Sequence, residues 1–291
     1  MPYYFGIFFA LIALFAWGFS DFLIQKSSRA IGTWKVLFSV GIVGSIILFP
    51  FIRGEISSLE SKDFLLLAVL GLVIFFAALL NFEALKKGKI AIIEPLIGME
   101  LPITVALSIA FGKDKLSLIE LCLVAVVFVG LLMVVTMHHK HLHQSRKTIE
   151  KGVLLAVAAA IGLALTNFLV GISSRQISPL MVIWFAQTQI AVMCIIFLVY
   201  TKQFRPVLTG LISHLKLTLG ESLLYNLGWV AFALATTSVA ISIVTAISES
   251  YIVLGVILGI FVNHEKIRRY QIVGIVLATI GILALSAFAI N

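Results

Sequence analysis

Long apolar runs, separated by short polar connectors, make up nearly the whole chain. An α-helix needs about 20 apolar residues to cross the hydrocarbon core of a membrane. The runs that have this length predict ten membrane-spanning helices, at residues 3–24, 33–51, 64–84, 90–111, 116–137, 152–173, 179–200, 217–236, 239–262 and 270–289. The pattern therefore predicts an all-α integral membrane protein with ten transmembrane helices.

Composition excludes an ordinary soluble protein. Apolar residues form 61% of the chain and charged residues only 12%, whereas soluble domains carry about 25% charged residues. A chain of 291 residues has too little interior to bury so much apolar surface. The net charge of +8 comes from Lys and Arg in the connectors, which determine topology and do not indicate nucleic-acid binding. We expect the lipid bilayer as the surroundings and the plasma (inner) membrane as the location.

The chain repeats internally. Residues 20–23 (Ser-Asp-Phe-Leu) match residues 166–169 (Thr-Asn-Phe-Leu), and the Ser-Ser-Arg of residues 27–29 recurs at 173–175. Ala84-Leu85 likewise matches Ala233-Leu234 further along. The sequence thus divides into a first five-helix repeat (1–137), a His-rich basic linker (138–151) and a second five-helix repeat (152–291). Because five is an odd number, the second repeat enters the membrane from the opposite side, which predicts two inverted repeats.

Short motifs in both halves resemble those of the drug/metabolite transporter superfamily, specifically its EamA-type members. They are Trp17-Gly18 in the first span, Ala84-Leu85 in the third, the acidic turns around Asp114 and Glu265, and Gly130 and Gly281 in the spans after those turns. The resemblance implies a secondary carrier that works by alternating access, with a binding cavity between the halves. Such carriers move amino acids, nucleotide sugars, choline-like amines and drugs, so the substrate stays open.

The orientation of the chain also stays open. Most of the 21 Lys and Arg residues lie in connectors after odd-numbered spans. The positive-inside rule places these connectors in the cytoplasm and therefore both termini outside. The family resemblance implies cytoplasmic termini instead.

Two acidic residues near the middle of predicted spans are the strongest functional candidates. Glu100 and Glu249 occupy equivalent places in the two repeats, and no Lys or Arg lies at their depth. An ionised carboxylate there costs at least a few kcal/mol, so we expect each group to be protonated or bound to a cation. Pro95 and Pro102 flank Glu100 and predict a kinked helix. The alternative is a protonated glutamate that only joins two helices by hydrogen bonds.

A wider set of polar and aromatic residues is expected to complete a binding site. Carboxylates together with aromatic faces recognise amines and quaternary ammonium groups. The candidates are Asp21 with its repeat mate Asn167, the aromatic residues Trp17, Tyr225 and Tyr251, and the amides Asn81, Asn226 and Gln187. Trp184 and Trp229 are further aromatic residues inside predicted spans. For Asp21 the alternative is an interfacial position near the helix end, and for the aromatics it is packing. Glu94 and Glu221 lie near predicted helix starts, where a carboxylate complements the helix dipole.

These features favour a secondary transporter of a small polar metabolite, coupled to protons and directed toward a cationic or zwitterionic substrate such as an amine or amino acid. Its expected partners are that substrate, protons as coupling ion and the lipid bilayer. The alternatives are a membrane enzyme or assembly factor without transport, or a sugar or nucleotide-sugar carrier. We expect no enzyme, since no catalytic or nucleotide-binding motif occurs. We also expect no cofactor and no metal site.

Overall fold

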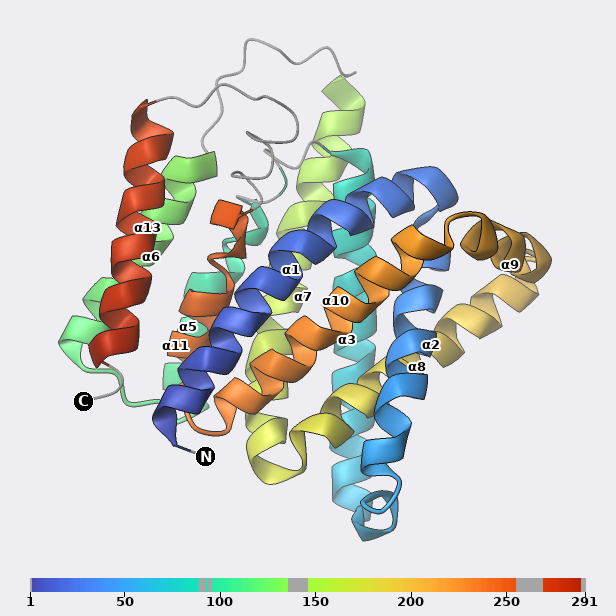
Figure 1. Cartoon of the computed structure of the whole chain (residues 1–291), viewed down its shortest axis with the longest axis horizontal. Coiled ribbons are helices and arrows are strands. Elements are labelled where there is room, and N and C mark those ends of the chain that lie inside the picture. The colour runs from blue at the N-terminus through green and yellow to red at the C-terminus, as the bar shows by residue number, and fades with distance from the viewer. Residues whose placement is uncertain (1, 89–92, 94–95, 136–145, 255–268, 289–291) are drawn as a thin grey trace.

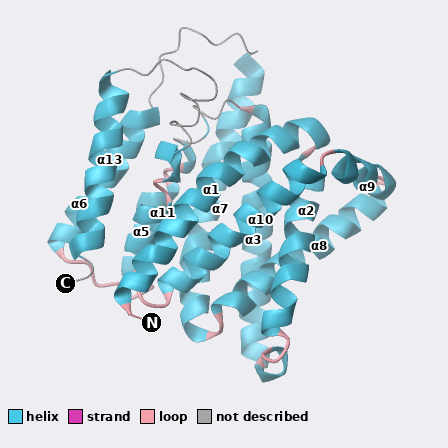
Figure 2. Cartoon of the chain, viewed as in Figure 1, coloured by secondary structure: helices cyan, strands magenta, loops and turns pink. Residues whose placement is uncertain are grey.

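The computed structural model describes residues 2–88, 93, 96–135, 146–254 and 269–288, and its regular structure within these ranges is helical (Figure 2). The helices of the first half are α1 (Tyr3–Ile31), α2 (Thr33–Ile52), the 3₁₀ turn η1 (Ile56–Ser58), α3 (Ser61–Lys87), α5 (Glu100–Ala110) and α6 (Leu118–Val135). Those of the second half are α7 (Arg146–Gln176), α8 (Pro179–Tyr200), α9 (Phe204–Ser213), α10 (Leu215–Thr236), α11 (Ile241–Ser248) and α13 (Arg269–Phe288).

Apolar helices long enough to span a membrane dominate the described part of the chain. Seven meet this condition by length and composition, namely α1, α2, α3, α7, α8, α10 and α13. Three shorter apolar helices, Glu100–Ala110, Leu118–Met133 and Ile241–Leu254, lie within the other three predicted spans. Large apolar side chains on the outer surface, such as Phe8 and Leu65, are more than half exposed and fit a lipid environment. The chain is thus a multi-pass membrane protein, while the count of ten spans stays a prediction.

Two repeated units of opposite direction build the molecule. In Figure 1, α1 rises from the end that holds both termini whereas its counterpart α7 descends toward that end, and α6 and α13 are likewise antiparallel. Helix contacts follow a two-fold pattern: α1 packs on α10 as α3 packs on α7, α2 packs on its own counterpart α8, and α6 packs on α13. The structure therefore has the inverted-repeat architecture that the sequence predicts.

Small residues allow the counterpart helices to approach closely. A Cβ atom placed on Gly41 of α2 would lie 2.7 Å from the backbone nitrogen of Ala191 in α8. One placed on Gly130 of α6 would likewise lie 2.7 Å from the backbone nitrogen of Ala278 in α13. In lipid, helices associate largely through such tight packing, because the hydrocarbon tails are as apolar as the side chains. Both glycines are therefore required by backbone contact between helices.

Replacing Gly130 with valine is expected to destabilise the protein, because the backbone of α13 must move to accept the side chain. Overpacking of this kind costs about 1–3 kcal/mol, which should appear as a lower melting temperature of the purified protein. Gly54→Val is the matched control, since a Cβ at Gly54 meets nothing within 4 Å. Equal melting temperatures for the two variants would contradict the close contact.

Candidate functional site

A cavity lies at the centre of the molecule, between the two repeats. It holds about 340 Å³ of space, part of it open to solvent, and is lined by Trp17, Asp21, Asn81, Glu100, Leu163, Asn167, Tyr225, Trp229, Glu249 and Tyr251. These residues come from α1, α3, α5, α7, α10 and the segment around α11. Both halves therefore contribute to one chamber, which is how inverted repeats build a central site.

Interrupted helices place the two central glutamates. Gly98 and Met99 form a turn directly before α5, so Glu100 is the first residue of that helix. Glu249 caps the C-terminal end of α11, and a further helical segment begins after it at Tyr251. A break in a membrane helix leaves backbone polar groups that only a cavity or protein contact can satisfy. The predicted kink near Glu100 is thus confirmed as a turn, and the second repeat has a matching break.

The two glutamates meet in the cavity wall. The Glu249 carboxyl lies within hydrogen-bonding reach of the Glu100 carboxyl and of the Asn167 side chain. Asn167 Nδ2 also donates to Glu100 Oε2 at 3.4 Å. Glu100 is 3% exposed and Glu249 only 1%. A carboxylate can only accept hydrogen bonds, so contact between two carboxyl groups requires a proton on at least one of them.

Asp21 brings a third carboxyl group to the cavity. It lies in the middle of α1, which continues ten residues beyond it to Ile31, and its side chain is in hydrogen-bonding contact with Tyr251. Asp21 is 8% exposed and does not lie near the end of α1, where the apolar pattern had placed it. None of the ten lining residues is Lys, Arg or His.

Aromatic rings line the same cavity beside these acids. The ring centroids of Trp17 and Trp229 lie 4.9 Å apart, and those of Trp17 and Tyr251 lie 6.2 Å apart, both edge to face. Tyr225 contacts Trp229 with centroids 6.3 Å apart. Gly228 makes room for this cluster, since a Cβ there would lie 2.4 Å from the Trp17 indole. A cation held by the carboxyl groups would face π-electron density from both repeats.

Several buried polar atoms of the lining residues have no protein partner within the described chain. They are the indole N–H groups of Trp17 and Trp229, the Asn81 carbonyl Oδ1 and the Glu249 Oε2. A buried polar group without a partner costs about 1–3 kcal/mol. Two donors and two acceptors are thus open in the same chamber, which suits a small polar ligand.

Most residues expected from the sequence line this cavity: Trp17, Asp21, Asn81, Glu100, Asn167, Tyr225, Glu249 and Tyr251. The other two, Asn226 and Gln187, do not. Asn226 Nδ2 donates to the backbone oxygens of Val40 and Ser222, at 3.1 and 2.8 Å. Gln187 is buried beside Gly44 at the same α2–α8–α10 contact. Both amides thus lie between packed helices. Asn226 hydrogen-bonds to backbone carbonyls, and Gln187 fills the space beside Gly44.

One lining residue, Leu163, was not expected. It lies 146 residues after Trp17, the same offset that relates Asn167 to Asp21, so the repeat itself would have identified it. Trp229 lies one turn after Tyr225 on α10 and lines the cavity, whereas Trp184 does not. Glu94 and residues 138–145 of the predicted linker lie outside the described residues. Residues 146–151, which were also expected to belong to the linker, form the start of α7.

The arginines of the repeated Ser-Ser-Arg motif donate to backbone carbonyls at helix ends and do not line the cavity. Arg29 Nη2 donates to the Gly88 carbonyl at 2.7 Å, just past α3. Its repeat mate Arg175 donates through Nε to the Thr236 carbonyl at 2.8 Å and through Nη2 to the Val239 carbonyl at 3.0 Å, at the end of α10. Cations at helix C-termini satisfy the last carbonyls and complement the dipole.

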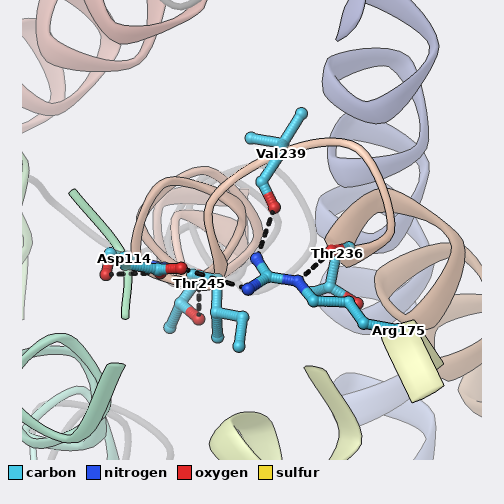
Figure 3. A network of polar contacts seen from close by, with 7 residues as sticks. Asp114, Arg175, Thr236, Val239 and Thr245 are labelled. Atoms are coloured by element: carbon cyan, nitrogen blue, oxygen red, sulfur yellow. Dashed lines mark hydrogen bonds and ion pairs between the residues drawn. The ribbon is translucent and has the colours of Figure 1, made fainter. Parts of the chain in front are cut away.

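Arg175 also connects α10 to the turn between α5 and α6. Its Nη1 lies 3.2 Å from Asp114 Oδ1, and Figure 3 shows the guanidinium group between that carboxylate and the carbonyls of Thr236 and Val239. Asp114 Oδ2 accepts from the backbone nitrogen and hydroxyl of Ser242, both at 3.1 Å, at the start of α11. This network therefore joins both repeats on the side of the cavity that faces the termini.

Removing Arg175 is expected to destabilise the protein, because the network that joins the two repeats is lost. Arg175→Gln loses its charged hydrogen bonds and should lower the free energy of unfolding by about 1.5–3 kcal/mol. Arg53→Gln, at an exposed helix end, should change it by less than about 0.5 kcal/mol. Thermal unfolding of both purified variants measures the difference. A fall of the same size in both would show that Arg175 has no special structural role.

Comparison with known proteins agrees with this architecture. A protein of known crystal structure superposes with a TM-score of 0.74 over 98% of this chain and 97% of its own, at 13% identity, which shows a shared fold. An uncharacterized protein of Methanocaldococcus jannaschii, MJ1333.1, is 30% identical over 100 residues, which cover 34% of this chain and 72% of that protein. The model of the EamA-like transporter family matches twice, at residues 4–136 and 150–287. The chain is a multi-pass membrane protein of the plasma membrane and belongs to the EamA-like transporter family.

Proposed function

We propose that this chain is a proton-coupled secondary transporter of a small cationic or zwitterionic metabolite, such as an amine or amino acid. The observation that carries the proposal is the charge balance of the central cavity. Asp21, Glu100 and Glu249 face one chamber whose lining contains no basic side chain. Membership of a transporter family supports movement of a small solute across the membrane.

The coupling step follows from competition for the same carboxyl groups. A proton shared by Glu100 and Glu249 keeps the pair in contact, as their hydrogen bond requires. A substrate ammonium that enters the chamber replaces the proton as the balancing positive charge. Ligand and proton then occupy the site alternately, and each crosses the membrane in its own half of the cycle.

The remaining lining groups determine which ammonium compounds bind. The aromatic rings of Trp17, Trp229 and Tyr251 favour methylated or primary amines by cation–π contact. The Trp17 indole N–H is an open donor at the same cavity and would donate to a carboxylate oxygen of an amino acid. A sugar would leave the charge of the carboxyl groups unbalanced, so the geometry supports amines better than sugars.

Neutralising either central glutamate is expected to uncouple proton movement. Glu100→Gln and Glu249→Gln keep the shape of the side chain but lose the exchangeable proton. In liposomes loaded with a pH indicator, substrate-driven proton flux should fall about tenfold or more. The substrates tested are choline, putrescine, lysine and alanine, with glucose and a nucleotide sugar as comparison.

Glu83→Gln is the matched control, because Glu83 pairs with Lys87 at 2.9 Å at the end of α3, away from the cavity lining. It should leave the flux unchanged. Undiminished flux in both central variants would refute the coupling role, and flux driven only by glucose or the nucleotide sugar would refute the substrate class.

The aromatic wall is expected to set affinity for quaternary amines. Trp229→Leu removes a ring from the chamber and should weaken choline binding about tenfold or more, since a desolvated cation–π contact contributes about 2 kcal/mol. Trp229→Phe should weaken it less. Titration calorimetry on purified protein measures both affinities, and Trp184→Leu on α8, whose indole donates to the Ser45 carbonyl, is the control. Equal affinities for all three variants would contradict a cation–π site.

A further inference from the structure

Glu221 is a buried acidic residue that the central cavity does not use. It lies in the second turn of α10, is 0% exposed, and is absent from the cavity lining. Its position there was expected to complement a helix dipole. Instead its side chain contacts α1, where the Ser27 hydroxyl reaches Glu221 Oε2, while the Ser20 hydroxyl donates to its backbone carbonyl at 3.4 Å. Its second oxygen, Oε1, is buried without a partner among the described residues.

The hydrogen-bond count at Ser27 indicates where a proton lies. Ser27 Oγ is 3.2 Å from the Ile24 carbonyl and also contacts Glu221 Oε2. A serine hydroxyl has one hydrogen to donate. If Glu221 were ionised, either the Ile24 carbonyl or Glu221 Oε2 would contact Ser27 Oγ with no hydrogen between the two oxygen atoms. When Glu221 is protonated, its O–H donates to Ser27 Oγ, and Ser27 donates to the Ile24 carbonyl. Both contacts of Ser27 Oγ then have a hydrogen between the two oxygen atoms.

The charged groups nearby do not balance an ionised Glu221. The helices packed around this part of α10 present Asp21 and Lys26 on α1, Lys35 on α2, and Lys216 and Tyr225 on α10 itself, and α8 carries no acidic or basic residue. Among the side chains that the structure describes, none of these forms an ion pair or hydrogen bond with Glu221. A charged carboxylate in this place would cost at least a few kcal/mol.

The first repeat shows that packing does not require an acid here. The buried faces of α3 and α10 coincide when Leu67 is aligned with Thr218, Leu70 with Glu221, and Gly71 with Ser222. This structural alignment is shifted by two residues from the sequence match of Ala84-Leu85 with Ala233-Leu234, which is therefore not the structural equivalence. Leu70 is fully buried, and α3 packs on α7 as α10 packs on α1. An acidic residue in only one of two equivalent interfaces is therefore not explained by helix packing.

We infer that Glu221 is a second proton-binding site, separate from the central cavity, which holds its proton while α1 packs against α10 and releases it when that interface opens to water. The inference does not depend on the proposed substrate. Release of the proton leaves a carboxylate that only water can solvate, so separation of α1 from α10 and loss of the proton occur together. The site thus gives one of the two equivalent interfaces a pH dependence that the other lacks.

Infrared spectroscopy of the purified protein in lipid nanodiscs tests this inference without any substrate. At neutral pH, the difference between wild type and Glu221→Gln should contain the C=O absorption of one protonated carboxylic acid. Glu83→Gln, the control, should give only carboxylate bands, since Glu83 pairs with Lys87. Glu221→Leu reproduces the residue of the first repeat and provides the same difference spectrum if the glutamine variant folds poorly.

The opening of the interface is followed by hydrogen exchange along α10. In wild type, exchange of residues 215–225 should increase over the same pH range in which the protonated band disappears, whereas Glu221→Leu should show no such pH dependence. A difference spectrum with only carboxylate bands at neutral pH would overturn the inference. So would loss of the band when sodium chloride is added to a salt-free buffer, because the ligand would then be a metal cation. These outcomes are independent of whether Glu100 and Glu249 couple transport.

Discussion

The cost of placing a carboxylate in a membrane interior is the constraint on which the central site depends. Inversion of the repeats brings Glu100 and Glu249 to the same point, and Asp21 joins them in a chamber without a basic lining residue. An uncompensated charge on either glutamate inside a membrane would be costly, and the proposed shared proton or bound cation removes that cost. The two-fold arrangement thereby gives the proposed coupling its chemical basis.

The rest of the fold holds this pair in place. Helix breaks before Glu100 and after α11 place both carboxyl groups on the cavity wall. Glycines at the α2–α8 and α6–α13 contacts let the repeats approach to backbone distance. The Arg175–Asp114 network joins both repeats on the side of the cavity that faces the termini. If access to the cavity alternates as proposed, polar contacts such as that of Arg175 with Asp114 break, while the helices move largely as rigid bodies.

Much of this arrangement follows from the sequence, for definite physical reasons. Apolar length identifies the helices, and the offset between Asp21 and Asn167 identifies the inverted repeat and so the meeting of Glu100 with Glu249. What sequence does not supply is the direction in which an amide points. Asn226 and Gln187 have the same chemistry as Asn81, but they face the α2–α8–α10 contact. Glu221 was misjudged because distance from a helix start says nothing about its neighbours on α1. The short helix α9 was missed because it lies in a connector of mixed polarity.

The exchange of a proton for a cationic ligand at the Glu100–Glu249 pair is the central claim, and counting protons during binding tests it most directly. Calorimetric titration of the purified protein with a bound amine, in buffers of different ionisation enthalpy, gives the number of protons released per ligand. The account predicts close to one proton released in wild type and none in a variant that carries glutamine at both positions. Binding of the amine with no proton released by the wild-type protein would contradict it.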